Sequence, residues 1–169
     1  VFLLRVDNTA GSLDMPSWVA THEVAHQWWT HQVIGADVQG RSMRTESLAE
    51  YTALMVMEHT YGRAQVHRFL RYELDRYLAG RGNEGMREMP LALVEDGQNY
   101  IAYNKGALAF YALRDYLGED KINSVLRGFL ARHRFSGPPF PTSGDLIAEL
   151  RAAAPAKLQP VITDLFDTI

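Results

Sequence analysis

The apolar residues of this chain recur mostly at the spacing of an α-helix. Between residues 63 and 79 they fall at positions 66, 69, 70, 74, 77 and 78, which places an apolar stripe along one helical face. Two short apolar runs, residues 53–57 and 107–113, lie inside similar patterns. The pattern and its breaks predict helices over about residues 16–32, 43–61, 63–79, 98–117, 120–133, 142–153 and from 160 onwards. We therefore predict a mainly α fold.

Glycine, proline and capping residues mark the ends of these helices. Pro16 suits the first turn of a helix, and Gly62, Gly80 and Gly118 each follow the last periodic residue of one. Thr142 and the acidic residue three positions later form a capping-box pattern. Residues 80–97 are rich in glycine, so they predict a long irregular connection, and such loops are often functional.

The first six residues do not follow the helical pattern. They are rich in Val, Leu and Phe and predict a β-strand over residues 1–6. A buried strand needs partners, and we expect them upstream of Val1, so that this chain is a piece of a longer protein. Residues 1–169 are then expected to form a single domain, helical except for this remnant strand.

Composition and charge exclude several classes of function. The 169 residues include 47% hydrophobic and 22% charged residues, which is ordinary for a globular domain. A net charge of -3 gives no support to nucleic-acid binding. The chain has no cysteine, so a metal would have to be held by His, Asp and Glu. No apolar run approaches the length of a membrane span.

The candidate chemistry begins at residues 22–26, His-Glu-Val-Ala-His. Residues four apart share a helix face, so His22 and His26 can direct both imidazoles at one point. Two neutral imidazoles make half of a tetrahedral zinc site. Glu23 lies one position further round the helix and could hold a water molecule at the metal. This is the H-E-x-x-H arrangement of zinc hydrolases.

A catalytic zinc usually has three protein ligands and one open position, so a third ligand is needed. Glu46 begins the next predicted helix, and two antiparallel helices with a short connection would bring it to the histidines. Glu50, one turn further on, could accept a hydrogen bond from the non-ligating nitrogen of a histidine. The alternatives are that Glu46 favours the helix dipole and that Glu50 pairs with an exposed neighbour.

Residues 22–28, HEVAHQW, followed by Glu46 in a Glu-x-x-Ala setting, resemble the M1 family of zinc aminopeptidases, which are gluzincins. Tyr103-Asn104-Lys105-Gly106 is similar to the family's Tyr-x-Lys-Gly segment, and its tyrosine lies 57 positions after Glu46. The resemblance covers roughly residues 17–133. It implies the helical part of a thermolysin-like catalytic domain.

The sequence departs from the family pattern in three places. The connection between His26 and Glu46 holds nineteen residues, one more than is usual, which a loop can absorb. The usual Asn-Glu-Gly at the third ligand reads Thr45-Glu46-Ser47. The Gly-x-Met-Glu-Asn segment that binds the substrate's amino group is not in this chain and would lie upstream of Val1. Aminopeptidase specificity therefore has no support from these residues, and the isolated chain is expected to be inactive.

The residues from Glu46 to Glu58, ESLAEYTALMVME, are most similar to a bacterial branch of the family. In some members of that branch the peptidase-like domain is fused to an ABC-type permease. The resemblance therefore implies a bacterial parent protein that is associated with a membrane.

The resemblance implies zinc-dependent hydrolysis of peptide bonds, of the aminopeptidase type. Zinc held by His22, His26 and Glu46 would activate a water molecule, and Glu23 would act as the general base. Tyr103 would stabilise the oxyanion. Spacing alone favours a core tyrosine at residue 103, and the Tyr-x-Lys-Gly match is what favours the catalytic role. Tyr100 is the reserve candidate.

Two further interpretations stay open. The chain could be a catalytically silent zinc-binding domain with a regulatory or sensing role in a membrane transporter. A purely structural zinc site would need neither Glu23 nor Tyr103, which argues against that reading. The chain could also be a helical interaction domain in which the motif is accidental, and that reading predicts no bound zinc.

Overall fold

Helices form nearly all of the regular structure in residues 13–169, which are described here by a computed structural model. The helices are α1 (Met15–His26), α2 (Leu48–Tyr61), α3 (Arg63–Asn83), α4 (Gly106–Leu117), α5 (Glu119–His133), α6 (Ser143–Ala153) and α7 (Gln159–Ile162). Wide π-helical segments adjoin several of them: η1 (Gln27–Gln32), η2 (Met43–Ser47), η4 (Tyr100–Lys105) and η6 (Thr163–Asp167). Short 3₁₀ helices are η3 (Leu91–Leu93) and η5 (Ala156–Leu158). The predicted mainly α fold is confirmed, and the strand predicted over residues 1–6 lies outside the described residues.

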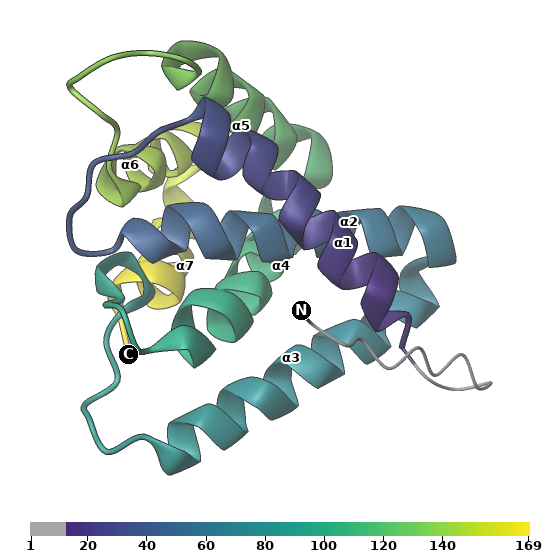
Figure 1. The fold of residues 1–169 in the computed structure, drawn as a ribbon. Coiled ribbons are helices and arrows are strands. Elements are labelled where there is room, and N and C mark those ends of the chain that lie inside the picture. The colour runs from purple at the N-terminus through teal and green to yellow at the C-terminus, as the bar shows by residue number, and fades with distance from the viewer. Residues whose placement is uncertain (1–12) are drawn as a thin grey trace.

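Helix α2 is the centre of the structure. It is buried on nearly all sides, as expected of a helix with few polar positions. Helix α1 crosses it, and α3 and α4 pack against it (Figure 1). The core includes Trp18 of α1, whose ring lies 4.7 Å from the ring of Phe69 of α3. Burying each such aromatic side chain contributes about 1.5–3 kcal/mol, so these contacts fix the positions of α1 and α3 around α2.

Most of the predicted helix ends lie where the structure has them. Gly62 and Gly118 end α2 and α4 with positive φ angles of 83° and 88°, a conformation that favours glycine. Thr142 and Asp145 form the predicted capping box at the start of α6. The Asp14 side chain accepts a hydrogen bond from the Ser17 backbone at the start of α1.

The prediction that Gly80 ends the third helix is wrong. Helix α3 continues through Gly80 to Asn83, so the irregular connection that follows is shorter than predicted and contains η3. Gly80 has a different role, because a Cβ added there would lie 2.4 Å from Cβ of Tyr100. The glycine thus permits α3 to approach η4 closely, which no local pattern in the sequence could indicate.

We predict that Gly80→Ala destabilises the protein and that Gly82→Ala does not. The methyl group at residue 80 would clash with Tyr100, and overpacking of this kind costs about 1–3 kcal/mol. Gly82 lies in the same helix with open space around its Cα, so alanine there is expected to stabilise the helix by about 0.5–1 kcal/mol. Urea unfolding of both variants measures the difference, and equal stability would contradict the role assigned to Gly80.

Candidate metal centre

Helix α1 presents two imidazoles at one point. His22 is 6% exposed and His26 is half-buried one turn later on the same face. Their Nε2 atoms lie 3.1 Å apart, and the ring planes are nearly perpendicular, at 86°. Both rings therefore direct one nitrogen to a shared position, as the four-residue spacing predicts.

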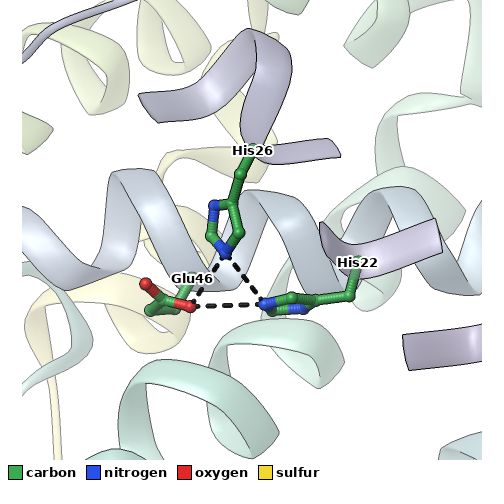
Figure 2. Close-up of side chains that lie close together, drawn as sticks. All are labelled: His22, His26 and Glu46. Atoms are coloured by element: carbon green, nitrogen blue, oxygen red, sulfur yellow. Dashed lines mark hydrogen bonds and ion pairs between the residues drawn. The ribbon is translucent and has the colours of Figure 1, made fainter. Parts of the chain in front are cut away.

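Glu46 reaches the same position from η2, the segment that leads into α2. Its Oε2 atom lies 3.3 Å from Nε2 of His22 and 3.5 Å from Nε2 of His26. Figure 2 shows the three ligand atoms at the corners of a triangle. The structure therefore brings together the three residues that the sequence analysis selected as ligands.

The triangle has the dimensions of one face of a zinc tetrahedron. Zinc binds imidazole nitrogen and carboxylate oxygen at about 2.0–2.1 Å, so neighbouring ligand atoms around it lie about 3.3 Å apart. The three edges here are 3.1, 3.3 and 3.5 Å. Oε2 of Glu46 is also buried and makes no hydrogen bond among the described residues. Buried polar atoms normally have a partner, so a metal ion bound to this oxygen would account for its environment. These residues fit a zinc ion and leave its fourth position open.

Each histidine has a polar group at its other ring nitrogen. Oε1 of Glu50 lies 3.3 Å from Nδ1 of His22, and Trp18 Nε1 donates a hydrogen bond to the other Glu50 oxygen at 2.6 Å. Nδ1 of His26 lies 3.0 Å from the hydroxyl of Thr30. A donor hydrogen at each Nδ1 leaves the Nε2 lone pair free for a metal. The sequence analysis named Glu50 but missed Thr30, although its position four residues after His26 was a usable signal.

Charges at the site depend on one another. Burial opposes a proton on His22, but the carboxylates of Glu46 and Glu50 outweigh it and raise the pKa of His22 to about 9. Burial alone would raise the pKa of the Glu46 carboxyl, but the His22 and His26 imidazoles hold that pKa well below its usual range. Glu46 is therefore a carboxylate at every physiological pH. A positive charge, either a proton or a metal ion, is favoured at the centre of the triangle.

Glu23 and Tyr103 face a common cleft beside the triangle. Its volume is about 630 Å³, and both side chains line it together with His26 and Glu46. Glu23 is exposed to solvent. The Tyr103 ring stacks on the His22 ring, with centroids 5.6 Å apart and planes at 13°. Burial and then the Glu46 carboxylate raise the pKa of Tyr103 above its usual range, so the phenol stays protonated and can donate a hydrogen bond.

Tyr100, the other candidate, does not line this cleft. It stacks on Tyr77 at 6.0 Å, on the side of η4 that faces α3. The structure therefore places Tyr103, and not Tyr100, beside the histidines.

The π-helical turn that carries Tyr103 is held on several sides. Ser47 donates a hydrogen bond to the Ala102 carbonyl at 2.6 Å, and Asn104 donates one to Glu73 at 2.6 Å. A Cβ at Gly106 would lie 2.1 Å from the Ser47 hydroxyl, so the glycine of the Tyr-x-Lys-Gly segment permits this contact. Ser47 is one of the departures from the family pattern, and its hydroxyl ties the segment of Glu46 to the segment of Tyr103.

Known proteins are similar to this chain in sequence and in fold. The family model of the Peptidase family M1 domain matches residues 3–165. A Caenorhabditis elegans protein named "Putative aminopeptidase-2" is 25% identical over 130 residues, which are 76% of this chain and 7% of that protein. The structure is similar to that of a mutant M1 zinc metallopeptidase from Deinococcus radiodurans, solved with a Tyr-Ser-Ala substrate, with a TM-score of 0.66 and 22% identity. That match covers 88% of this chain and 32% of the other, so this chain spans only a minor part of both relatives.

We predict that Thr30→Val weakens zinc binding about ten-fold. Valine keeps the shape of threonine but removes the oxygen at His26 Nδ1, and loss of such a partner typically costs 10–100-fold in metal affinity. Thr60→Val is the control, because Thr60 is exposed at the far end of α2. Competition with a chromophoric chelator measures the dissociation constants. Unchanged affinity in Thr30→Val would show that the hydroxyl does not orient His26.

Proposed function

Because the chain belongs to peptidase family M1, we propose that it forms the zinc-binding part of a metallopeptidase that hydrolyses peptide bonds, of the aminopeptidase type. The observation that carries this proposal is the triangle of His22, His26 and Glu46, whose edges fit a zinc tetrahedron with one open position. The cleft beside the triangle provides room for a peptide. It also contains Glu23 and Tyr103, the two further groups that the chemistry needs.

A zinc ion bound by the three ligands would supply a Lewis acid that polarises a water molecule and the peptide carbonyl. The Glu23 carboxylate then accepts a proton as the water oxygen attacks the carbonyl carbon, and it passes that proton to the leaving nitrogen as the C–N bond breaks. Its position directly after His22, on the wall of the cleft and open to solvent, supports this role.

The Tyr103 hydroxyl donates a hydrogen bond to the oxyanion that develops on the carbonyl oxygen. Its raised pKa keeps the donor hydrogen in place at neutral pH. The contacts that hold its turn support the role, because a fixed donor stabilises the transition state without having to reorganise.

A catalytically silent zinc-binding domain is the alternative. A structural zinc site is closed by four protein ligands, whereas residues 13–169 offer three at this position. A zinc site without catalytic activity also needs neither a carboxylate nor a phenol beside the metal, and the cleft contains both, in Glu23 and Tyr103. These observations favour the peptidase.

We further propose, from the likeness of residues 46–58 to the bacterial branch, that the parent protein is a bacterial protein attached to a membrane. No helix among residues 13–169 is long and apolar enough to cross a bilayer. Fractionation of cells that express the full-length parent tests the proposal, and recovery of the parent only in the soluble fraction would refute it.

We predict that Glu23→Gln in the full-length protein retains zinc but hydrolyses peptides at least a hundred-fold more slowly. Glutamine keeps the shape of glutamate without its basicity, and general acid–base catalysis typically contributes 10²–10⁴-fold. Zinc content and turnover of amino-acid anilides are measured on the same samples. Glu84→Gln, a half-buried substitution in the loop after α3 and outside the metal cleft, serves as the control and should have no effect. If Glu23→Gln also turned over at the normal rate, Glu23 would not be the base.

We predict that Tyr103→Phe lowers kcat by about 10²–10³ with little change in KM. The substitution removes one hydrogen-bond donor to the oxyanion and leaves the stacked ring against His22. Steady-state kinetics on the full-length protein measure both constants, and Tyr116→Phe, at a tyrosine 58% exposed, is the matched control. A rise in KM at constant kcat would instead assign Tyr103 to substrate binding.

A further inference from the structure

A second cavity lies on the other side of Tyr103 from the metal cleft. Its volume is about 730 Å³, and it opens between α1, α3 and η4. Tyr103 and Asn99 line both cavities, and Glu50, which contacts His22, lines the second one. The second cavity is therefore a direct neighbour of the candidate metal centre.

Glu73 of α3 lines this cavity and has an unusual environment for a buried acid. It is 1% exposed, and its hydrogen-bond partner is the neutral side chain of Asn104, which contacts Oε2. The other buried glutamates have cations: Glu50 lies 3.3 Å from His22, and Glu88 lies within 3.0 Å of two basic side chains.

Buried acidic groups in proteins are normally paired with a cation, so a buried acid that lies beside a cavity and forms no ion pair with a described residue requires an explanation. Burial and then the nearby Glu50 charge raise the pKa of Glu73 to about 8. Arg76 also lines the cavity, but it is exposed and lies over the Tyr72 ring at 5.9 Å, and it forms no ion pair with Glu73. Within residues 13–169, the cavity thus contains a buried acid that forms no ion pair.

The rest of the cavity wall is suited to a positive charge. Trp18, Tyr72 and Tyr100 line it, and the faces of aromatic rings attract ammonium and guanidinium groups. Asn99 and Asn104 add side-chain amides, whose carbonyl oxygens can accept hydrogen bonds from the same groups. The acid and the rings are independent features, and both favour the same kind of ligand.

We propose that the second cavity binds a cationic group of the peptide substrate, with Glu73 as its ion-pair partner. The proposal rests on the proposed peptidase function. The group is an ammonium or guanidinium carried either by the first residue's α-nitrogen or by a basic side chain. The cavity adjoins the metal cleft at Asn99 and Tyr103, so a group bound there would lie next to the residues proposed for the chemistry.

The experiment measures peptide binding by calorimetry, with zinc-loaded full-length protein that carries Glu23→Gln to prevent turnover. Four tripeptides are compared, whose first residue is lysine or norleucine, each with a free or an acetylated N-terminus. Adding Glu73→Gln is expected to weaken the peptides that carry the recognised charge about ten-fold or more, and to leave acetyl-norleucine unchanged. If Glu73→Gln weakens binding of only the two lysine peptides, the recognised group is the lysine side chain. If it weakens binding of only the two peptides with a free N-terminus, the recognised group is the α-ammonium.

Asp75→Asn is the matched control, because Asp75 lies two residues further along α3, is exposed and pairs with Arg71. It is expected to leave all four affinities unchanged. Two results would overturn the proposal. One is equal weakening of the binding of all four peptides by Glu73→Gln, which would indicate that the cavity had changed shape. The other is that Glu73→Gln weakens the binding of none of them.

A measurement on protein with Glu73 intact does not depend on the folding of the Glu73 variant. If the lysine peptide binds no tighter than the norleucine peptide, and the free peptide no tighter than the acetylated one, the cavity does not recognise charge. Because binding is measured without turnover, a parent protein that binds cationic peptides but hydrolyses none would reject only the peptidase function. Normal hydrolysis without charge selectivity would reject only the cavity.

Discussion

The packing of α1 across α2 is the contact on which the site depends. The two helices are in extensive contact, and Ala25 of α1 and Ala49 of α2 are fully buried. Two indole hydrogen bonds fix the crossing, from Trp18 to Glu50 at 2.6 Å and from Trp29 to Thr52 at 3.0 Å. A shift of α1 along α2 would break both and would separate the histidines from Glu46. The geometry of the three ligand atoms is therefore a consequence of core packing.

The packing of α1 against α2 buries charged side chains, which is energetically unfavourable. His22, Glu46 and Glu50 lie close together in a region with little access to solvent, and an acid and an imidazole there stabilise each other only as a pair. A divalent cation at the centre of the triangle would neutralise the charges of two carboxylates, those of Glu46 and Glu50. Glu73 is also buried, and it forms no ion pair with any residue between 13 and 169, so its carboxylate form would be stabilised by an added cation. The metal centre and the second cavity therefore have the same requirement, because the buried acids on α2 and α3 are stabilised by positively charged partners.

Two of the π-helical segments carry site residues. Glu46 lies in η2 and Tyr103 in η4, and the two segments are joined by the hydrogen bond from Ser47 to Ala102. A π-helical turn widens the helix and changes the direction of its side chains, and such turns are frequent at functional sites. Here they turn Glu46 toward α1 and bring the Tyr103 ring onto His22. Departure from the family pattern at Ser47 is accommodated by Gly106, which leaves room for the hydroxyl.

The sequence by itself determined whatever depends on neighbours along the chain. The helical period put His22 and His26 on one face, the glycines at 62 and 118 ended two helices, and Thr142 with Asp145 began another. Only the tertiary structure decided what depends on contacts between distant segments. It showed that Gly80 serves packing against Tyr100, and that Tyr103 and not Tyr100 faces the metal cleft. It also showed that Glu73 is buried and forms no ion pair with the part of the chain from residue 13 onwards. The physical reason is that caps and helix faces follow from local backbone geometry, whereas burial and pairing are set by which side chains the packed helices bring together.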